Sequence, residues 1–290
     1  MSTNLIIQGE DIASADLRAL HAMVSGNGIE RIEHVAHQAF RLTGVDASDA
    51  NRAAVKARCN AAQLDFAFVA PGRGLTDIGL LAMDMDSTLI TIECIDEIAD
   101  FVGRKNEVSA VTASAMRGEI DWPQSLRQRV ALLAGLGESA LQRVYDERLA
   151  LSPGADKLVQ AAKNAGIKTL LVSGGFTFFT ERLKTRLGLD FAFSNTLEVV
   201  DGKLTGRVIG PLCDAGGKAR HVRETAAAFG LPRERIIVIG DGANDLPMMG
   251  EAGLSIAYRA KPVVQAQASV AINLVGLDGV LALFEKTGKL

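Results

Sequence analysis

The sequence predicts an α/β protein: a doubly wound parallel sheet, a helical cap inserted after its first strand, and an N-terminal ferredoxin-like α+β domain. From residue 80 onward, apolar strand-like runs alternate with helical patterns, as in sheets whose parallel strands are joined by crossover helices. Residues 93–150 show helical patterns without a strand, directly after the first apolar run. Residues 1–77 show a separate βαββαβ pattern, and Pro71-Gly72-Arg73-Gly74 then marks a domain boundary before residues 78–290.

The composition is that of an ordinary globular protein, with 290 residues of which 48% are hydrophobic and 22% charged. The net charge of -3 and the pI near 5.9 argue against nucleic acid and anionic membranes as partners. Three cysteines without a CxxC pair indicate neither a disulfide framework nor a zinc site. Because no signal-peptide pattern or membrane-spanning apolar run occurs, we expect a cytoplasmic protein.

The N-terminal domain is expected to be regulatory or to mediate assembly, because nothing before Gly79 carries recognisable catalytic chemistry. Its strands are predicted near residues 5–7 and 66–69, with one or two more over 29–42, and its helices over 12–24 and 46–62. His34 and His37 fall in a predicted strand, where residues three apart face opposite sides. We therefore expect structural roles for both histidines rather than metal binding.

An apolar strand over Leu80–Met83 is followed by Asp84 and Asp86. A buried parallel strand would release both carboxylates on the same side at its carboxyl end, where ligands of α/β sheets bind. Two carboxylates so close together repel each other, so a divalent cation with oxygen ligands is expected beside them. The alternative is that Asp86-Ser87-Thr88 only caps the next helix.

The helical stretch that follows predicts a cap that closes over the site and excludes water. Ser152 is then expected to cap a helix that ends at Gly166. A strand over 167–172 leads to the turn Ser173-Gly174-Gly175, which offers a hydroxyl and bare amides at the start of a helix over 176–187. Such a turn favours an anion, although turn geometry alone also selects these residues.

Two further segments carry polar groups after strands. Asp201-Gly202 predicts a β-hairpin within residues 191–209, and a helix over 218–229 places Lys218 in its first turn. A cation is unfavourable at that end of a helix, which hints at an anionic partner.

The next segments are a strand over 235–240 followed by Asp241, Asn244 and Asp245, a strand over 253–257, a helix over 261–267, a strand over 270–272 and a closing helix over 279–289.

If these strands share one sheet, their carboxyl ends converge on one crevice. Carboxylates, a lysine and helix N-termini at one site are typical of phosphoryl transfer, in which an aspartate can serve as the nucleophile. The motifs Asp84-x-Asp86-Ser-Thr, Ser173-Gly-Gly, Lys218 and Gly240-Asp-Gly-Ala-Asn-Asp245 occur in this order and resemble the four motifs of the haloacid-dehalogenase superfamily of phosphatases. The resemblance covers residues 80–290 and implies a HAD-like fold.

Within that superfamily, residues 84–98, 125–130 and 172–176 are similar to the phosphoserine phosphatases. The resemblance implies hydrolysis of O-phospho-L-serine to L-serine and phosphate, the last step of serine biosynthesis. It makes Asp84 the nucleophile and Asp86 the group that protonates the leaving oxygen. Mg²⁺ would be held by Asp84, the backbone carbonyl of Asp86, and Asp241, supported by Asp245; Ser173, Gly174, Lys218 and Asn244 would hold the phosphoryl group.

The same resemblance places Glu93 on the substrate ammonium and Arg129 on its carboxylate. Arg127 lies on another face of the same predicted helix, and Met116 and Trp122 are candidates for an apolar wall or for the core. The sequence leaves open another small phosphate ester as substrate. A receiver-type signalling domain is disfavoured because it needs no cap, and dehalogenation because it needs no acid at Asp86.

The N-terminal domain resembles the small amino-acid-binding (ACT-like) regulatory modules of biosynthetic enzymes in its pattern of elements. This resemblance implies a homodimer or feedback by serine. The sequence does not distinguish Mg²⁺ from Mn²⁺.

Overall fold

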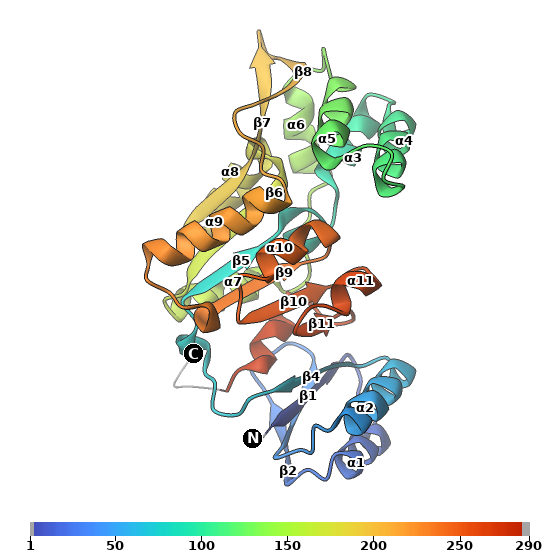
Figure 1. Cartoon of the computed structure of the whole chain (residues 1–290), viewed down its shortest axis with the longest axis vertical. Coiled ribbons are helices and arrows are strands. Elements are labelled where there is room, and N and C mark those ends of the chain that lie inside the picture. The colour runs from blue at the N-terminus through green and yellow to red at the C-terminus, as the bar shows by residue number, and fades with distance from the viewer. Residues whose placement is uncertain (1–2, 286–290) are drawn as a thin grey trace.

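The computed structural model describes residues 3–285, apart from the side chain of Met116, and shows two units packed against each other (Figure 1). The smaller unit has a four-stranded antiparallel sheet, and the larger has a seven-stranded sheet with helices on both faces. Helices at the far end of the larger unit form the cap. Within residues 3–285, no helix is long and apolar enough to span a membrane.

The smaller unit has the predicted ferredoxin-like order, with its strands arranged β2-β3-β1-β4. Its first strand is buried on both faces: Leu5 and Ile7 pack under the two helices, and Ile6 packs against the larger unit. This is why three apolar residues follow one another there without alternation. The elements are β1 (Asn4–Gly9), α1 (Ser14–Met23), β2 (Gly28–Ile32), β3 (Gln38–Thr43), α2 (Asp49–Ala62) and β4 (Asp65–Val69).

Polar groups fix the contact between the two units. The buried carboxylate of Asp65 accepts backbone N–H bonds from Asn273, Leu274 and Val275 at 2.8 to 3.0 Å. Arg41, also buried, donates to the carbonyl of Phe284 at 2.8 Å. One acidic and one basic side chain of the smaller unit therefore hold it to the backbone of the larger unit.

The two histidines lie in the loop between β2 and β3, so the strand predicted at these positions is wrong. His34 donates from Nε2 to the carbonyl of Leu281 in the larger unit at 3.1 Å. His37 donates from Nε2 to Oε1 of Gln8 at 2.7 Å. Both rings serve the packing of the smaller unit.

The large sheet has the strand order β11-β10-β9-β5-β6-β7-β8, parallel except for the antiparallel hairpin of β7 and β8. In the central strand, Leu80 and Ala82 face one apolar cluster while Leu81 and Met83 face the other. The strands are β5 (Leu80–Met83), β6 (Lys168–Phe176), β7 (Phe191–Val200), β8 (Lys203–Ile209), β9 (Ile236–Gly240), β10 (Leu254–Tyr258) and β11 (Val270–Ile272).

Helices cover both faces of this sheet, which confirms the doubly wound fold. One apolar cluster joins the sheet to α9, α10 and α11, and the other joins it to α7 and α8. These helices are α7 (Ala155–Asn164), α8 (Thr177–Leu187), α9 (Ala215–Ala228), α10 (Leu246–Met249) and α11 (Pro262–Gln265). Short helical turns complete the unit: η1 (Leu75–Asp77), η3 (Arg233–Arg235), η4 (Ala243–Asp245) and η5 (Leu277–Leu283).

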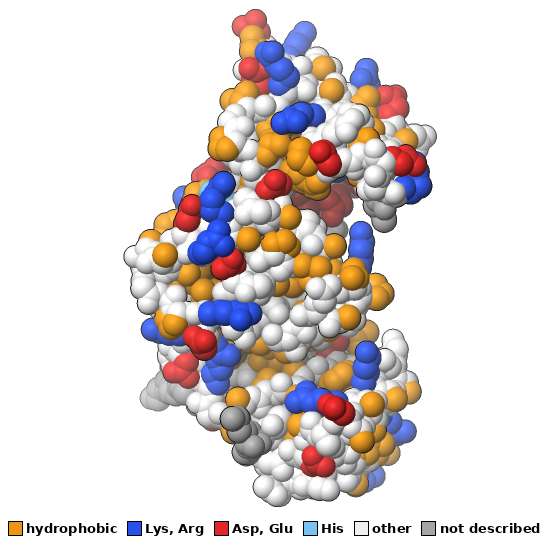
Figure 2. Space-filling view, viewed as in Figure 1, with side chains coloured by type: hydrophobic (Ala, Val, Ile, Leu, Met, Phe, Trp, Pro, Cys, Tyr) orange, Lys and Arg blue, Asp and Glu red, His pale blue; other side chains and the backbone are white. Residues whose placement is uncertain are grey.

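The cap follows the tight turn η2 (Met85–Leu89) and consists of α3 (Cys94–Phe101), α4 (Lys105–Met116), α5 (Trp122–Ala131) and α6 (Ser139–Glu147). Two antiparallel segments join it to the sheet: Thr91 N–H donates to the carbonyl of Ala150, and Ser152 N–H to that of Leu89, each at 3.0 Å. Figure 2 shows a recess between the cap and the sheet unit, with acidic side chains inside it.

Several expected element bounds are wrong. Helix α9 begins at Ala215 rather than at Lys218, and the side chain of Asp214 caps it by accepting the N–H of Gly217 at 2.7 Å. Ser152 does not cap helix α7, which begins at Ala155 without a side-chain cap. Gly154 precedes it at φ +76° and lets Asp278 approach closely. Strand β6 continues to Phe176, so Ser173-Gly174-Gly175 lies in an irregularity of the strand.

The closing helix expected over 279–289 is wrong within the described residues, because η5 ends there at Leu283. Residues 286–290 lie outside the described part of the structure. The carbonyl of Phe284 accepts from Arg41, a bond that is available because the helix does not continue.

We expect Asp65→Ala to lower the free energy of unfolding by about 2–3 kcal/mol, because it leaves buried N–H donors without an acceptor. Urea unfolding at pH 7 measures this loss. Glu30→Ala, at an exposed position on β2, is the control and should change stability little. Equal stability of the two variants would contradict the anchoring role of Asp65.

Candidate active site

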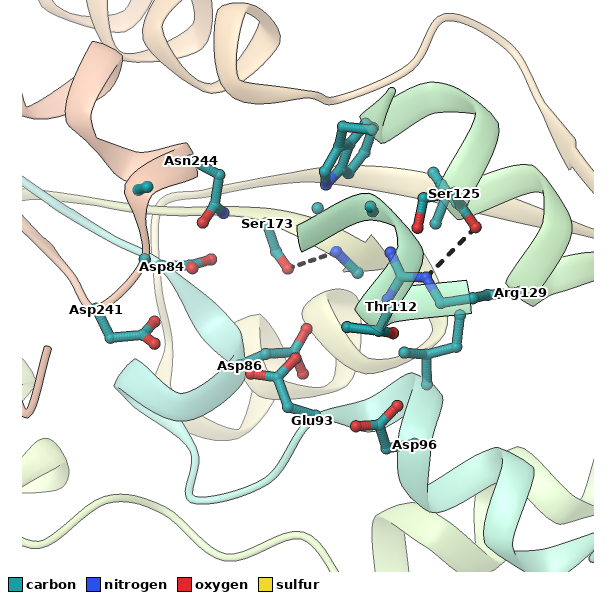
Figure 3. A pocket seen from close by; sticks show the side chains of 18 of the residues that line it. Asp84, Asp86, Glu93, Asp96, Thr112, Ser125, Arg129, Ser173, Asp241 and Asn244 are labelled. Atoms are coloured by element: carbon teal, nitrogen blue, oxygen red, sulfur yellow. Dashed lines mark hydrogen bonds between the residues drawn. The ribbon is translucent and has the colours of Figure 1, made fainter. Parts of the chain in front are cut away.

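A cavity of about 520 Å³ lies between the cap and the carboxyl ends of β5, β6 and β9 (Figure 3). The predicted site residues line it, with the exception of Asp245, which is fully buried and hydrogen-bonded to the cavity wall. The predicted residues at the cavity are Asp84, Asp86, Glu93, Arg129, Ser173, Gly174, Lys218, Asp241 and Asn244.

Lys218 is buried between two carboxylates. Its Nζ lies 2.8 Å from Oδ1 of Asp84 and 2.8 Å from Oδ1 of Asp245. Burial by itself would lower the pKa of Lys218, but the two carboxylates raise that pKa above its usual value. The side chain is therefore a fixed positive charge on the cavity floor, which explains a lysine in the first turn of α9.

Asp245 organises the turn after β9. Its Oδ2 accepts the backbone N–H groups of Asp241 at 3.1 Å and Gly242 at 3.0 Å, while Oδ1 accepts from Lys218. A Cβ at Gly240 would lie 2.4 Å from this carboxylate, so only glycine fits there. Both oxygens of Asp245 are thus used within the protein.

The carboxylates suit a hard divalent cation. Oxygens of Asp84, Asp241 and Asp245 lie within 4.8 Å of one another. Burial and the charge of Asp245 raise the pKa of Asp84 well above its usual range and that of Asp241 to about 6. Thr88, which the sequence analysis did not assign, donates to Oδ1 of Asp241 at 3.2 Å. A cation with oxygen ligands would offset this crowding of negative charge.

Asp86 follows Asp84 in the turn η2. Its Oδ1 accepts the N–H of Cys94 at 3.0 Å, which orients the carboxyl group toward the cavity. Burial and then the charge of Glu93 raise the pKa of Asp86 to about 7. Figure 3 shows the side chains of Asp86 and Glu93 close together on the same side of the cavity. A carboxyl group with this pKa both gives and takes a proton near neutral pH.

The turn Ser173-Gly174-Gly175 is held in shape by two side chains. The Oγ of Ser173 accepts the N–H of Gly175 at 2.8 Å. Asn195 on β7, fully buried, donates to the carbonyl of Gly174 at 2.9 Å and accepts the N–H of Cys213 at 2.8 Å. Asn195 is a second residue that the sequence analysis missed, since nothing in its local pattern distinguishes it from other strand residues.

The cap supplies the opposite wall. Arg129 projects from α5 into the cavity, with its Nε 3.4 Å from the carbonyl of Ser125, and burial lowers its pKa (Figure 3). Arg127 is exposed and does not line the cavity. Trp122 lines it and packs near Gly174, while the side chain of Met116 is outside the described part of the structure.

Two family models match the chain. The model described as haloacid dehalogenase-like hydrolase matches residues 81–250, and a domain of unknown function (DUF4072) matches residues 5–55. The first match covers more than half of the chain. The chain belongs to the haloacid dehalogenase-like hydrolases.

This hydrolase is similar to one curated protein and two solved structures, of which two are named for phosphoserine. It is 58% identical over 218 residues to a phosphoserine phosphatase of Polaromonas sp.. The aligned region covers 73% of this chain and 92% of that protein. A HAD family hydrolase from Salmonella enterica serovar Typhi has a TM-score of 0.90 at 32% identity, covering 98% of both chains. A probable phosphoserine phosphatase from Vibrio cholerae has a TM-score of 0.83 at 38% identity, covering 97% of this chain and 86% of that one.

We expect Lys218→Met to destabilise the hydrolase by about 3–5 kcal/mol in EDTA at pH 8, because two buried carboxylates lose their partner. Without the ammonium the folded-state pKa of Asp84 rises further above the unfolded value near 4. The folded state then binds more protons, so the deficit shrinks as the pH falls from 8 to 5.

Urea unfolding at pH 5 and pH 8 measures this difference. Arg220→Met, two residues further along α9 and partly exposed, is the control and should cost less than about 1 kcal/mol at both pH values. An equal deficit at both pH values for Lys218→Met would contradict this account.

Proposed function

We propose that this hydrolase is a phosphoserine phosphatase, which converts O-phospho-L-serine and water into L-serine and phosphate through an aspartyl-phosphate intermediate. The observation that carries the proposal is that one cavity holds two kinds of charged group. A carboxylate–lysine pair lies on the sheet side, and Glu93 and Arg129, of opposite charge, lie on the cap side. A substrate that suits both carries a phosphate ester, an ammonium and a carboxylate. The names of the similar proteins support this substrate.

Asp84 and Asp86 would carry out the chemistry. A carboxylate oxygen of Asp84 attacks phosphorus while the bond between phosphorus and the serine oxygen breaks, and Asp86 gives its proton to that oxygen. Water then attacks the phosphorus of the aspartyl phosphate, and Asp86 takes a proton from it. This second step releases phosphate and restores the carboxylate of Asp84. The raised pKa of Asp86 suits both transfers.

Ser173, the Gly174 amide, Lys218 and Asn244 would hold the phosphoryl oxygens. Lys218 is already fixed by its two ion pairs, so it needs no rearrangement as charge develops on the phosphoryl group. The bond from Asn195 to Gly174 holds the turn that presents the amide. The phosphate site is therefore built mainly before substrate binds.

Mg²⁺ is the cation we propose for the acidic cluster. Asp84, Asp241 and the backbone carbonyl of Asp86 would hold it, whereas Asp245 keeps its oxygens for Lys218 and the turn after β9. Carboxylate and carbonyl oxygens are the ligands that Mg²⁺ prefers. When bound, the ion neutralises charge on the phosphoryl oxygens during transfer.

Glu93 and Arg129 would select the amino-acid end of the substrate. Ser87 donates to Oε1 of Glu93 at 2.7 Å and so holds this carboxylate at the cavity wall for the substrate ammonium. The guanidinium of Arg129 would bind the substrate carboxylate, a pairing that its fork of donors favours. Trp122 would cover the short carbon skeleton.

We further propose that residues 1–77 form a regulatory or dimerisation domain beside a phosphatase domain of residues 78–290, whose cap spans about 93–150. The proposal includes a cytoplasmic homodimer inhibited by serine, as expected for the last step of serine biosynthesis. Sedimentation of the full chain and serine inhibition at saturating substrate test it. A monomer whose inhibition by serine vanishes at saturating substrate would contradict both roles.

The decisive experiment compares O-phospho-L-serine with p-nitrophenyl phosphate, which has no amino-acid end. We expect Arg129→Ala to lower kcat/KM for phosphoserine about 100-fold, since a charge-assisted contact of about 3 kcal/mol is lost. The aryl ester should change less than about threefold.

Arg127→Ala, on the exposed side of the same helix, is the matched control and should resemble wild type. Asp84→Asn should abolish turnover of both esters, and EDTA should do so until Mg²⁺ is restored. If wild type cleaves the aryl ester but not phosphoserine, the catalytic assignment stands and the substrate assignment fails.

A further inference from the structure

The cap is joined to the sheet unit at a second place, the hairpin of β7 and β8. The N–H of Gly135 donates to the carbonyl of Leu204, and the N–H of Leu204 donates to the carbonyl of Leu136, both at 2.8 Å. The N–H of Glu138 donates to the carbonyl of Gly202 at 2.9 Å. The loop between α5 and α6 therefore forms a short backbone ladder with the tip of the hairpin, which rises beside these helices in Figure 1.

The hairpin also contacts the end of α5 directly, at Gly206. This glycine has φ +83°, and a Cβ there would lie 2.9 Å from Cβ of Ala134 and 3.2 Å from both Cα and the carbonyl oxygen of Ala131. Such distances are shorter than ordinary van der Waals contact, so α5 would have to shift to accept a side chain. Ala131 lies two residues after Arg129 on the same helix.

The same hairpin reaches the phosphate-binding turn at its other end. Strand β7 pairs with β6, and Asn195 on β7 donates to the carbonyl of Gly174. At the opposite end of α5, the ring of Trp122 lies close enough to Gly174 to be 3.1 Å from a Cβ built there. One continuous element thus connects the turn that would bind phosphate with the helix that carries Arg129.

We propose that Gly206 is a positioning residue for substrate specificity: its contact with Ala131 and Ala134 sets where Arg129 lies relative to the phosphate-binding turn. The inference deepens the proposed function and depends on it. Phosphoserine has a fixed distance between its phosphate and its carboxylate, so a displaced Arg129 weakens binding of that substrate. A phosphate ester without a carboxylate does not contact Arg129 and is unaffected.

The test compares Gly206→Ala with Gly210→Ala. Gly210 has φ +78° and follows the same strand, but a Cβ there meets no atom within 4 Å. Both glycines have a positive φ that disfavours alanine, so the difference between the two variants mainly reports the contact with α5. We expect Gly206→Ala to raise KM for phosphoserine about tenfold, with a smaller change in kcat, and to leave p-nitrophenyl phosphate turnover unchanged. Gly210→Ala should match wild type with both esters.

A double-mutant cycle with Arg129→Ala shows whether the effect passes through this side chain. If it does, Gly206→Ala causes no further loss in kcat/KM once Arg129 is absent. The proposal is overturned if the two glycine variants behave alike, if both esters lose activity equally, or if the losses from Gly206→Ala and Arg129→Ala are additive. Ala134→Val, which crowds the same contact without a glycine substitution, serves if Gly206→Ala folds poorly and should also raise KM.

A failure of the proposed function would look different. Wild type would then cleave p-nitrophenyl phosphate without a measurable preference for phosphoserine, before any glycine is changed. A wild type that prefers phosphoserine, together with a Gly206→Ala variant that keeps the wild-type KM, would overturn only the positioning role.

Discussion

The site depends on one buried ammonium, Lys218, held between Asp84 and Asp245. Burial and the charge of Asp245 raise the pKa of Asp84, and the ammonium of Lys218 opposes that rise. The lysine comes from α9, Asp84 directly follows β5, and Asp245 ends the turn η4 after β9, so the two ion pairs join three elements of the larger unit. The same two ion pairs balance the buried charges and hold these elements together at the cavity.

The carboxylates are similar in chemistry but differ in environment, and this separates their tasks. Asp245 has both oxygens occupied by protein donors, whereas Asp86 accepts one backbone N–H and has a pKa near 7. Glu93 lies on the cap and is tied to Ser87. In the proposed mechanism, the sheet side would supply the phosphoryl chemistry and the charged groups of the cap would select the substrate.

Much of the site was predictable because strand ends are visible in a sequence. Asp84, Ser173 and Asp241 each follow an apolar run, and parallel pairing brings such positions to one edge. Asn195 was not predictable, since its partners lie 21 and 18 residues away along the chain and its own strand pattern is unremarkable. Contacts that depend on the packing of distant segments leave no local signal.

The fold shows the same limit. The alternation of strands and helices predicted the doubly wound sheet, and the βαββαβ pattern predicted the smaller unit. The closing helix is wrong where η5 ends at Leu283, and the next carbonyl, of Phe284, accepts from Arg41 instead of from a following turn of helix. Ser152 failed as a cap because Gly154 and Asp278 set the start of α7. In each case a tertiary contact overrode a sound local preference.

The first strand of the smaller sheet, β1, is buried on both faces, and this restricts how the N-terminal unit could influence catalysis. Ile6 belongs to the same apolar cluster as the core of the larger unit, and Asp65 and Arg41 bond to its backbone. A unit held in this way does not move as a body independent of the larger unit. Its contacts with the segment after β11 and with η5 leave the two units sharing one apolar cluster, so they should unfold together.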